Sequence, residues 1–251
     1  MFPLRDTLRS RTTPVVNYLL IAVCVAVFIL QLNQGRRGGE KFAERYGMIP
    51  SRVLHPGKTI TVPEARVIRT VFGPKLVRVR RPVAPLAFTP WLTLLTCLFL
   101  HAGWLHIIGN MWFLIVFGDN VEDRLGHGRY LLFYLFGGVA ASLTHLALNA
   151  HSPLPTLGAS GAIAGVMGAY FVFFPTARVV TLVPIFIFIQ LIEIPAAVFL
   201  GIWFLFQLLE NAYARGGVET AGVAFWAHIG GFIAGLAIAA CVRWGPSARA
   251  R

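Results

Sequence analysis

The most telling segment of this 251-residue chain is Gly158-Ala159-Ser160-Gly161-Ala162-Ile163-Ala164-Gly165, a serine among small residues at the start of a long apolar run. Further along, Ala227-His228-Ile229-Gly230-Gly231-Phe232-Ile233-Ala234-Gly235 places a histidine in the same kind of surroundings. A hydroxyl and an imidazole, each on a segment stripped of bulk, are a candidate nucleophile and base.

The composition identifies an integral membrane protein. Hydrophobic residues make up 57% of the chain and charged residues 13%, with a mean hydropathy of +0.70, well beyond an average soluble domain. Six apolar runs are long enough to be spans: residues 15–32, 104–118, 130–148, 160–174, 195–209 and 223–242. We predict an all-α, polytopic membrane bundle of six transmembrane helices, with seven as the open alternative. The first half of 179–209 is expected to be an interfacial connector.

Arginine placement predicts the orientation. An even number of spans puts both termini on one side, and arginines flank the first span and follow the last, which favours the cytoplasm for that side. We predict a cytoplasmic segment 1–14, a membrane domain 15–244 and a cytoplasmic tail 245–251. The predicted location is a multi-pass protein of a bacterial or archaeal cell membrane. The flanking arginines are Arg5, Arg9, Arg11, Arg243, Arg249 and Arg251.

The connector 33–90 does not follow the charge rule that predicts this orientation. It carries twelve Lys or Arg against three Glu, yet this topology places it as a large basic first loop outside the membrane. Charge bias is read weakly in loops of this length, so the orientation stands. Patches at 59–62 and 76–79 are candidates for short strands. The loop either rests on anionic headgroups of membrane lipids or is simply solvated. Nucleic acid is excluded as a partner, because no aromatic-basic module accompanies the charge.

Four polar side chains are predicted to meet at one depth. His106 and Asn110 stand four residues apart and so share one face of the second span. At about 1.5 Å per residue, His106, Ser160 and His228 lie roughly 22–27 Å from the inner ends of their spans. In a hydrocarbon core of about 30 Å, all of them lie several ångströms below the outer surface.

Small residues explain how these segments come together. Gly161 with Gly165, and Gly231 with Gly235, form small-xxx-small patterns that let helix backbones approach closely. At the inner end of the second span, Glu122, Asp123 and Arg124 are expected to fix the following turn by ion pairing. The bland alternatives are a packing serine bonded to a carbonyl at 160 and an Asn110 that only ties two helices. His101 and His145 are expected to be packing or interface residues.

At these residues the chain resembles the rhomboid family of intramembrane serine proteases, from about residue 91 to 244. The resemblance implies that Ser160 is the nucleophile and His228 the general base of a dyad. Asn110 and His106, with the backbone N–H of Ser160, would form the oxyanion hole. It also implies transmembrane protein substrates cut near the membrane surface, with no metal or cofactor. The matching motifs are Gly158-Ala159-Ser160-Gly161, Ala227-His228, His106-xxx-Asn110 and Glu122-Asp123-Arg124.

Two positions depart from that family pattern. In some members a tyrosine one turn after the serine stacks on the histidine, and this chain has Ala164 at that position. In many members an arginine follows the tryptophan of the first loop, whereas here Leu92 follows Trp91. With no acidic partner predicted for His228, an aromatic ring or the backbone must orient its imidazole. Phe225, Trp226 and the aromatics of the second span are the candidates. The polar loop 215–222 is the candidate cap over the site.

Three other functions remain as alternatives. A catalytically silent rhomboid-like protein would bind transmembrane clients, but it would be expected to lack Ser160 or His228. A metal-dependent hydrolase could use His101, His106, His145 and His228, although no HExxH-like pair supports it. A transporter would need paired carboxylates or repeated broken helices, which are lacking. The expected substrate is a single-span helix that unwinds easily at its outer end, with a small residue before the scissile bond.

Overall fold

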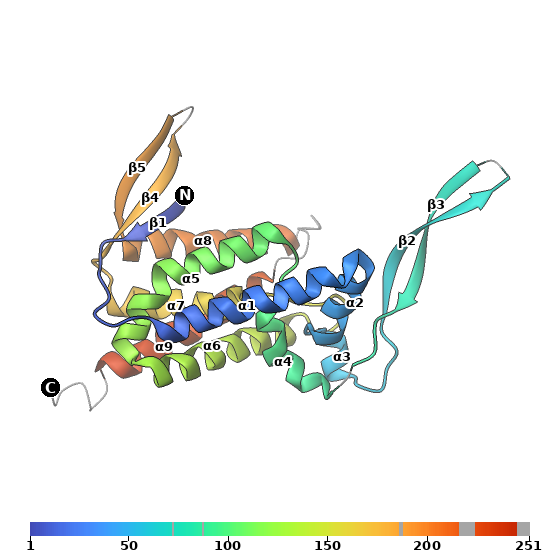
Figure 1. Ribbon diagram of the computed structural model, residues 1–251, viewed down its shortest axis with the longest axis horizontal. Coiled ribbons are helices and arrows are strands. Elements are labelled where there is room, and N and C mark those ends of the chain that lie inside the picture. The colour runs from blue at the N-terminus through green and yellow to red at the C-terminus, as the bar shows by residue number, and fades with distance from the viewer. Residues whose placement is uncertain (72, 87, 186–187, 216–223, 245–251) are drawn as a thin grey trace.

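The computed structural model is a bundle of long helices lying side by side, with two β-hairpins projecting from its ends (Figure 1). It describes residues 1–251 except 72, 87, 186–187, 216–223 and 245–251. The long helices are α1 (Val15–Asn33), α5 (Trp104–Leu125), α6 (His127–Leu148), α7 (Ser160–Phe173), α8 (Ala196–Arg215) and α9 (Phe225–Trp244). This arrangement agrees with the mostly helical, polytopic architecture that the sequence predicts.

The start of α1 and the ends of α5, α7 and α9 lie at one end of the bundle (Figure 1). The start of α1 meets the end of α5, where the Glu122 carboxylate accepts the Val16 and Asn17 N–H groups at 2.9 and 2.7 Å. The last turn of α9 meets the last turn of α7, where Arg243 donates to the Val172 carbonyl. We call this the N-terminal end of the bundle, and the opposite one the loop end.

Length and composition single out part of the bundle as spans. Among the described residues, α1, α6 and α9 are long and apolar enough to cross a membrane. Pro90–Phe99 and Trp104–Leu125, which are bent by 79° relative to each other, pass the same test only when taken together as one broken span. Ser160–Phe173 and Ala196–Ala212 are shorter apolar helices. The class of integral membrane protein is thus supported, and the count of six spans stays a prediction.

Helix α7 is the central helix, and its small residues explain why. Every side chain from Gly161 to Tyr170 is buried, and the helix contacts α5, α6, α8 and α9. A Cβ added to Gly231 would collide with the Gly161 carbonyl oxygen, and one added to Gly235 would collide with that of Gly165. At these four glycines the backbones of α7 and α9 are in contact, and β-carbons at Gly231 and Gly235 would not fit.

The prediction of an all-α fold is corrected by two antiparallel sheets. Strands β1 (Phe2–Asp6), β4 (Arg178–Ile185) and β5 (Phe188–Pro195) form a sheet of order β1-β4-β5. The expected interfacial connector is thus a hairpin. Runs of β-branched and aromatic residues favour strands, and periodicity alone does not distinguish such a run from a span.

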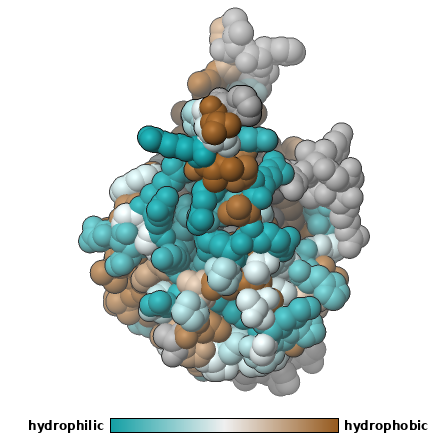
Figure 2. Space-filling model, turned by 90° about the vertical axis from the view of Figure 1, so that its right-hand side faces the viewer, coloured by the Kyte–Doolittle hydropathy of each residue, from teal (hydrophilic) through white to brown (hydrophobic). Residues whose placement is uncertain are grey.

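The second sheet lies in the basic loop. Strands β2 (Thr61–Thr70) and β3 (Gly73–Pro82) pair over their whole length, so the predicted short strands are longer than expected. The end of the bundle from which this hairpin projects is mostly hydrophilic (Figure 2). That polarity suits a surface in water.

The base of the basic loop is docked onto the bundle. The loop contains α2 (Gly35–Tyr46) and α3 (Pro50–Leu54), and the short turns η1 (Pro90–Leu92), α4 (Thr93–Thr96) and η2 (Cys97–Phe99) continue the chain from its end. The buried Glu44 carboxylate accepts two bonds from Arg81, at 2.7 and 3.0 Å, and one from the Ala84 N–H at 2.9 Å. Such a bidentate pair is geometrically specific. It ties the foot of β3 to α2.

The turn after α5 is held differently from the prediction. Glu122 is fully buried, and besides the α1 N–H groups it meets the His127 Nδ1 at 2.5 Å. Arg124 lies over the Phe173 ring, 5.8 Å from its centroid, and Asp123 accepts two bonds from Thr12. The acidic residues therefore fasten the start of α1 as well as the turn. The local charge pattern did not predict that Glu122 accepts hydrogen bonds from the start of α1.

Candidate active site

Ser160 is the first residue of α7, and the loop before it is shaped by Gly158. Gly158 has a φ of +123°, a conformation that favours glycine, and its N–H donates to the Cys97 carbonyl at 2.9 Å. The first N–H groups of a helix lack intrahelical partners. Ser160 is thus held where its own N–H and the positive end of the helix dipole face the same space.

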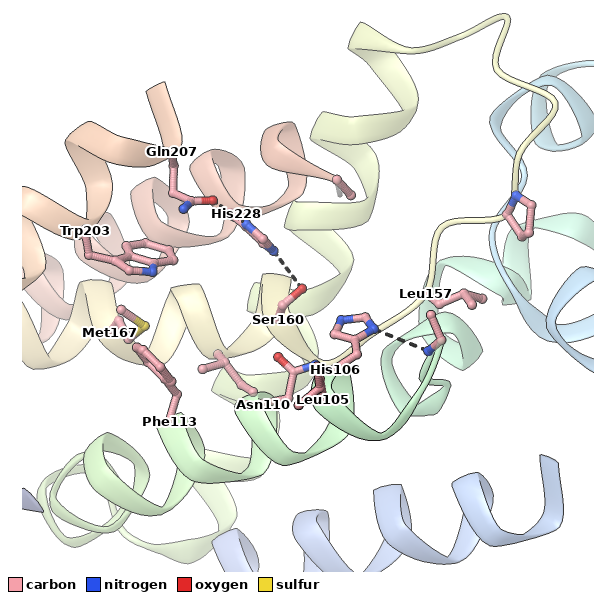
Figure 3. A pocket seen from close by; sticks show the side chains of 15 residues that line it. Leu105, His106, Asn110, Phe113, Leu157, Ser160, Met167, Trp203, Gln207 and His228 are labelled. Carbon is pink, nitrogen blue, oxygen red and sulfur yellow. Dashed lines mark hydrogen bonds between the residues drawn. The ribbon is translucent and has the colours of Figure 1, made fainter. Parts of the chain in front are cut away.

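Ser160 and His228 are in direct contact, although 68 positions separate them in the chain. The Ser160 Oγ lies 2.8 Å from the His228 Nε2 (Figure 3). His228 is on the first turn of α9, one turn before Gly231. The glycine contact between α7 and α9 is what makes so short a distance possible. The expected meeting of these two side chains is therefore present in the geometry.

Two residues of α8 complete the surroundings of His228, and sequence reasoning missed both. The Gln207 Oε1 lies 2.6 Å from the His228 Nδ1, and the Trp203 ring lies 6.2 Å from the imidazole, tilted by 41°. An amide oxygen only accepts, so Nδ1 carries the proton and Nε2 is left to accept from the serine. The available signal was a lone glutamine in an apolar run, one turn after a tryptophan.

His106 and Asn110 face Gly158 from the first turns of α5. A Cβ at position 158 would lie 2.8 Å from the His106 ring and 3.6 Å from the Asn110 Nδ2. The Ala102 N–H donates to His106 Nδ1 at 3.3 Å, which leaves Nε2–H as a donor. The buried Asn110 Nδ2 has no partner. Unused donors therefore gather beside the start of α7.

These side chains line one cavity of about 620 Å³. Its polar residues gather around Ser160, while Phe113, Met167 and Trp203 form an apolar wall farther along (Figure 3). The lining comes from α5, α7, α8, α9 and the loop before α7. The cavity can take an extended peptide segment with an apolar flank. The candidate cap 215–222 falls almost wholly outside the described residues.

The other histidines offer no metal site in the described part of the chain. His101 is buried with its ring edge toward His106, 5.3 Å between centroids, and His145 lies beside Asn149 at 3.5 Å. No three His, Cys, Asp or Glu side chains of the described residues gather closely enough to hold a metal ion. A metal-dependent hydrolase therefore has no ligand set in this part of the chain.

The fold and the site together define a class of protein. It is a polytopic helical membrane protein in which the central helix begins at a serine that is hydrogen-bonded to a histidine. Comparison with known proteins specifies the family. The family model described as Rhomboid domain matches residues 89–245. That is more than half of the chain, and the protein belongs to the rhomboid family.

Several curated relatives are similar over shorter stretches. The chain is 43% identical over 79 residues to "Rhomboid protease GluP" of Bacillus subtilis, which covers 32% of this chain and 15% of that protein. It is 38% identical over 78 residues to "Rhomboid-like protein 11, chloroplastic" of Arabidopsis thaliana, covering 31% and 28%. It is 35% identical over 82 residues to "Putative rhomboid protease YdcA" of Bacillus subtilis, covering 32% and 40%. In each case the match spans less than half of the relative's length.

Proposed function

We propose that this protein is an intramembrane serine endopeptidase that cleaves transmembrane substrates near the outer membrane face. The observation that carries the proposal is the 2.8 Å contact between the Ser160 Oγ and the His228 Nε2 inside a cavity. Membership of a family that includes proteins named as proteases supports the same activity.

The proposed chemistry begins at Ser160. Its hydroxyl oxygen attacks the substrate carbonyl carbon while the proton passes to His228 Nε2, and the same proton then reaches the leaving amine as the peptide C–N bond breaks. Water then attacks the acyl carbon and gives a proton to His228 Nε2, which passes it to the Ser160 Oγ as the ester bond breaks and the carboxylic acid product leaves. Gln207 acts as a positioning residue, since it accepts from Nδ1 and so keeps Nε2 free to accept the serine proton.

The tetrahedral intermediate needs donors for its oxyanion. The Ser160 N–H, the unpartnered Asn110 Nδ2 and the His106 Nε2–H are the proposed donors. Donors fixed before the reaction stabilise a developing charge without reorganising. Gly158 keeps this space open, because a side chain there would fill it.

The proposed substrates are transmembrane helices that unwind locally at their outer ends. Ser160 stands in a run of glycine and alanine, and Ala102, Gly109 and Ala224 are the small residues of the cavity lining, which supports a small residue before the scissile bond. The apolar wall of Phe113, Met167 and Trp203 suits the more apolar part of the segment. The substrate and the membrane lipids are the proposed partners, and no cofactor is needed for this mechanism.

The test is cleavage of a model transmembrane substrate in liposomes by wild type, Ser160→Ala and His228→Ala. A matched control is Ser142→Ala, since the hydroxyl of Ser142 on α6 donates to the Leu94 carbonyl and meets no histidine. We expect cleavage by wild type and by Ser142→Ala only, unchanged by a metal chelator. Cleavage that survives Ser160→Ala would overturn the mechanism. A folded wild type that cleaves no substrate would favour a client-binding protein.

A further inference from the structure

The β4–β5 hairpin is an apolar element, and near its tip no described part of the chain covers it. Residues 179–192 contain no charged side chain. Near its tip Phe188, Ile189 and Leu191 are exposed by 65, 70 and 65%. So much apolar surface is costly in water. The hairpin also has no role in the proposed chemistry, which lies near the other end of α7.

Both faces of this hairpin are apolar. Leu191 pairs with Leu182, and the adjacent Ile192 pairs with Thr181 and points to the opposite face. Ile189 shares the face of Leu191, whereas Phe188 shares that of Ile192. A strand pair with one face on a protein surface and one in water alternates apolar and polar residues. In the β4–β5 pair apolar and polar residues do not alternate. A partner protein that covered one face would therefore leave the other apolar face in water.

The charged residues of the sheet are confined to its foot. Arg5 and Glu193 both pair with Val180, and Arg178 pairs with Pro195. These three side chains are exposed, and Asp6, the fourth charged residue of the sheet, pairs with Val179 at the same foot. From this foot outward to the tip, the hairpin carries apolar side chains, with Thr181 and Gln190 as polar exceptions. The charged side chains therefore lie next to the bundle, and the part of the hairpin that projects away from it is apolar.

The hairpin lies at the level where the helices end. Strand β4 follows the end of α7, and the Ala196 N–H that begins α8 donates to the Ala177 carbonyl at 2.7 Å. Figure 1 shows the hairpin projecting sideways from the bundle, across the helix axes. If the helices cross the bilayer, the hairpin therefore extends along the membrane plane, continuous with the lipid-facing surface.

We propose that the β4–β5 hairpin is a lipid anchor inserted into the leaflet at the N-terminal end of the bundle. Acyl chains cover both faces of its outer half, and the exposed Arg5 and Arg178 meet the headgroup phosphates at its foot. Because β4 continues from α7, the anchor sets the depth of the helix that begins at Ser160. It also holds β1, which pairs with β4.

The test is the environment of a nitroxide spin label on each face of the hairpin. Ile189→Cys and Ile192→Cys are each made in a Cys241→Ser background, in which Cys24 and Cys97 stay buried. The full chain is reconstituted in vesicles of phosphatidylcholine and phosphatidylglycerol. Val67→Cys is the matched control, an exposed aliphatic site on the basic β2–β3 hairpin.

We expect labels at 189 and 192 to collide readily with oxygen, which concentrates among acyl chains, and to be shielded from a water-soluble nickel chelate. The label at 67 should show the opposite preference. Collision with nickel at 189 or 192 would place the hairpin in water and overturn the proposal. Shielding from both reagents would show a protein contact and overturn it too, with spin–spin broadening identifying a second copy. None of these readouts depends on proteolysis, so the proposed function is tested separately.

Discussion

Two serines of this bundle differ in what their hydroxyl groups meet. The hydroxyl of Ser142 donates to a backbone carbonyl, the usual arrangement in a membrane helix. Ser160 instead meets an imidazole nitrogen. Serine is a weak nucleophile until a base takes its proton. We therefore propose that Ser160 is more reactive than Ser142 because its hydroxyl group meets the His228 Nε2.

Asn110→Ala tests the oxyanion hole. Removing a donor that acts only on the developing charge should lower kcat by about 10²–10³-fold, with KM little changed. Initial rates with a model transmembrane substrate would measure this. The buried Asn110 Nδ2 has no structural partner, so thermal stability in detergent should hold. A rate near that of wild type would remove Asn110 from the chemistry.

Gln207→Leu and Gln207→Glu separate positioning from packing. The leucine variant fills similar space without an acceptor, so the imidazole loses the bond that sets its tautomer. We expect kcat to fall by on the order of tenfold or more, and by no more than the roughly 10²–10⁴-fold that general-base catalysis supplies in total. The glutamate variant keeps an acceptor oxygen and should rescue most of the rate. Equal losses in both variants, or a change in KM alone, would contradict the role.

At the scale of elements, the α7–α9 crossing decides the site. Gly235→Ala would push a Cβ into the Gly165 backbone, and the helices would have to separate. We expect a loss of about 1–3 kcal/mol in the free energy of unfolding, as for other overpacked contacts, together with lower activity as Ser160 and His228 move apart. Thermal unfolding and cleavage rates would be measured side by side.

Gly201→Ala is the control for that variant. A Cβ on this α8 glycine would meet nothing within 4 Å, so only the helix propensity changes, in favour of alanine. We expect unchanged or slightly higher stability and normal cleavage. If Gly235→Ala behaved in the same way as Gly201→Ala, the close crossing would not be needed for the fold.

The β1 strand is fastened by a carboxyl group that titrates near neutral pH. Asp6 Oδ2 accepts the Tyr170 hydroxyl at 2.5 Å and the Asn120 amide at 2.9 Å. Burial raises the pKa of the Asp6 carboxyl from 3.8 to about 6. The folded state therefore holds this proton more tightly than the unfolded state, and the contribution to stability falls as pH rises from about 4 to 6.

Asp6→Asn should remove that component of the pH dependence. Two units of pKa correspond to about 3 kcal/mol, and we expect on the order of 1–2 kcal/mol because solvent reaches part of the group. Melting temperatures of wild type and variant would be compared between pH 4 and 7. The difference between them should change with pH in this window, and a constant difference would contradict the assignment.

For the whole molecule, the N-terminal strand and the end of α9 lie at one end of the bundle, and the basic loop lies at the other (Figure 1). We predict that the termini face the cytoplasm. In intact cells, a thiol reagent that cannot cross the membrane should then label Val67→Cys and spare Arg9→Cys, in a Cys241→Ser background. Permeabilised cells should show both labelled. The reverse pattern in intact cells would invert the topology.

Much of the site was predictable because local spacing and hydropathy act within single segments. His106 and Asn110 share a face by their spacing of four, and apolar run lengths placed His106, Ser160 and His228 at one depth. The rhomboid family was predicted from these motifs and confirmed by the Rhomboid domain match over residues 89–245. The mostly helical class followed from hydropathy, since in a bilayer a helix satisfies its own backbone.

Sequence alone thus determined the membrane class, the family and the candidate dyad. Tertiary structure decided the rest, because it depends on contacts between segments far apart in the chain. The pairing of Gln207 and Trp203 with His228 requires α8 to lie beside α9, and no local pattern encodes that rotation. The β4–β5 hairpin is similar, since an apolar run fits a strand or a span until its neighbour is known. Glu122 likewise accepts hydrogen bonds from the start of α1, more than a hundred positions away in the chain, which no local pattern predicts.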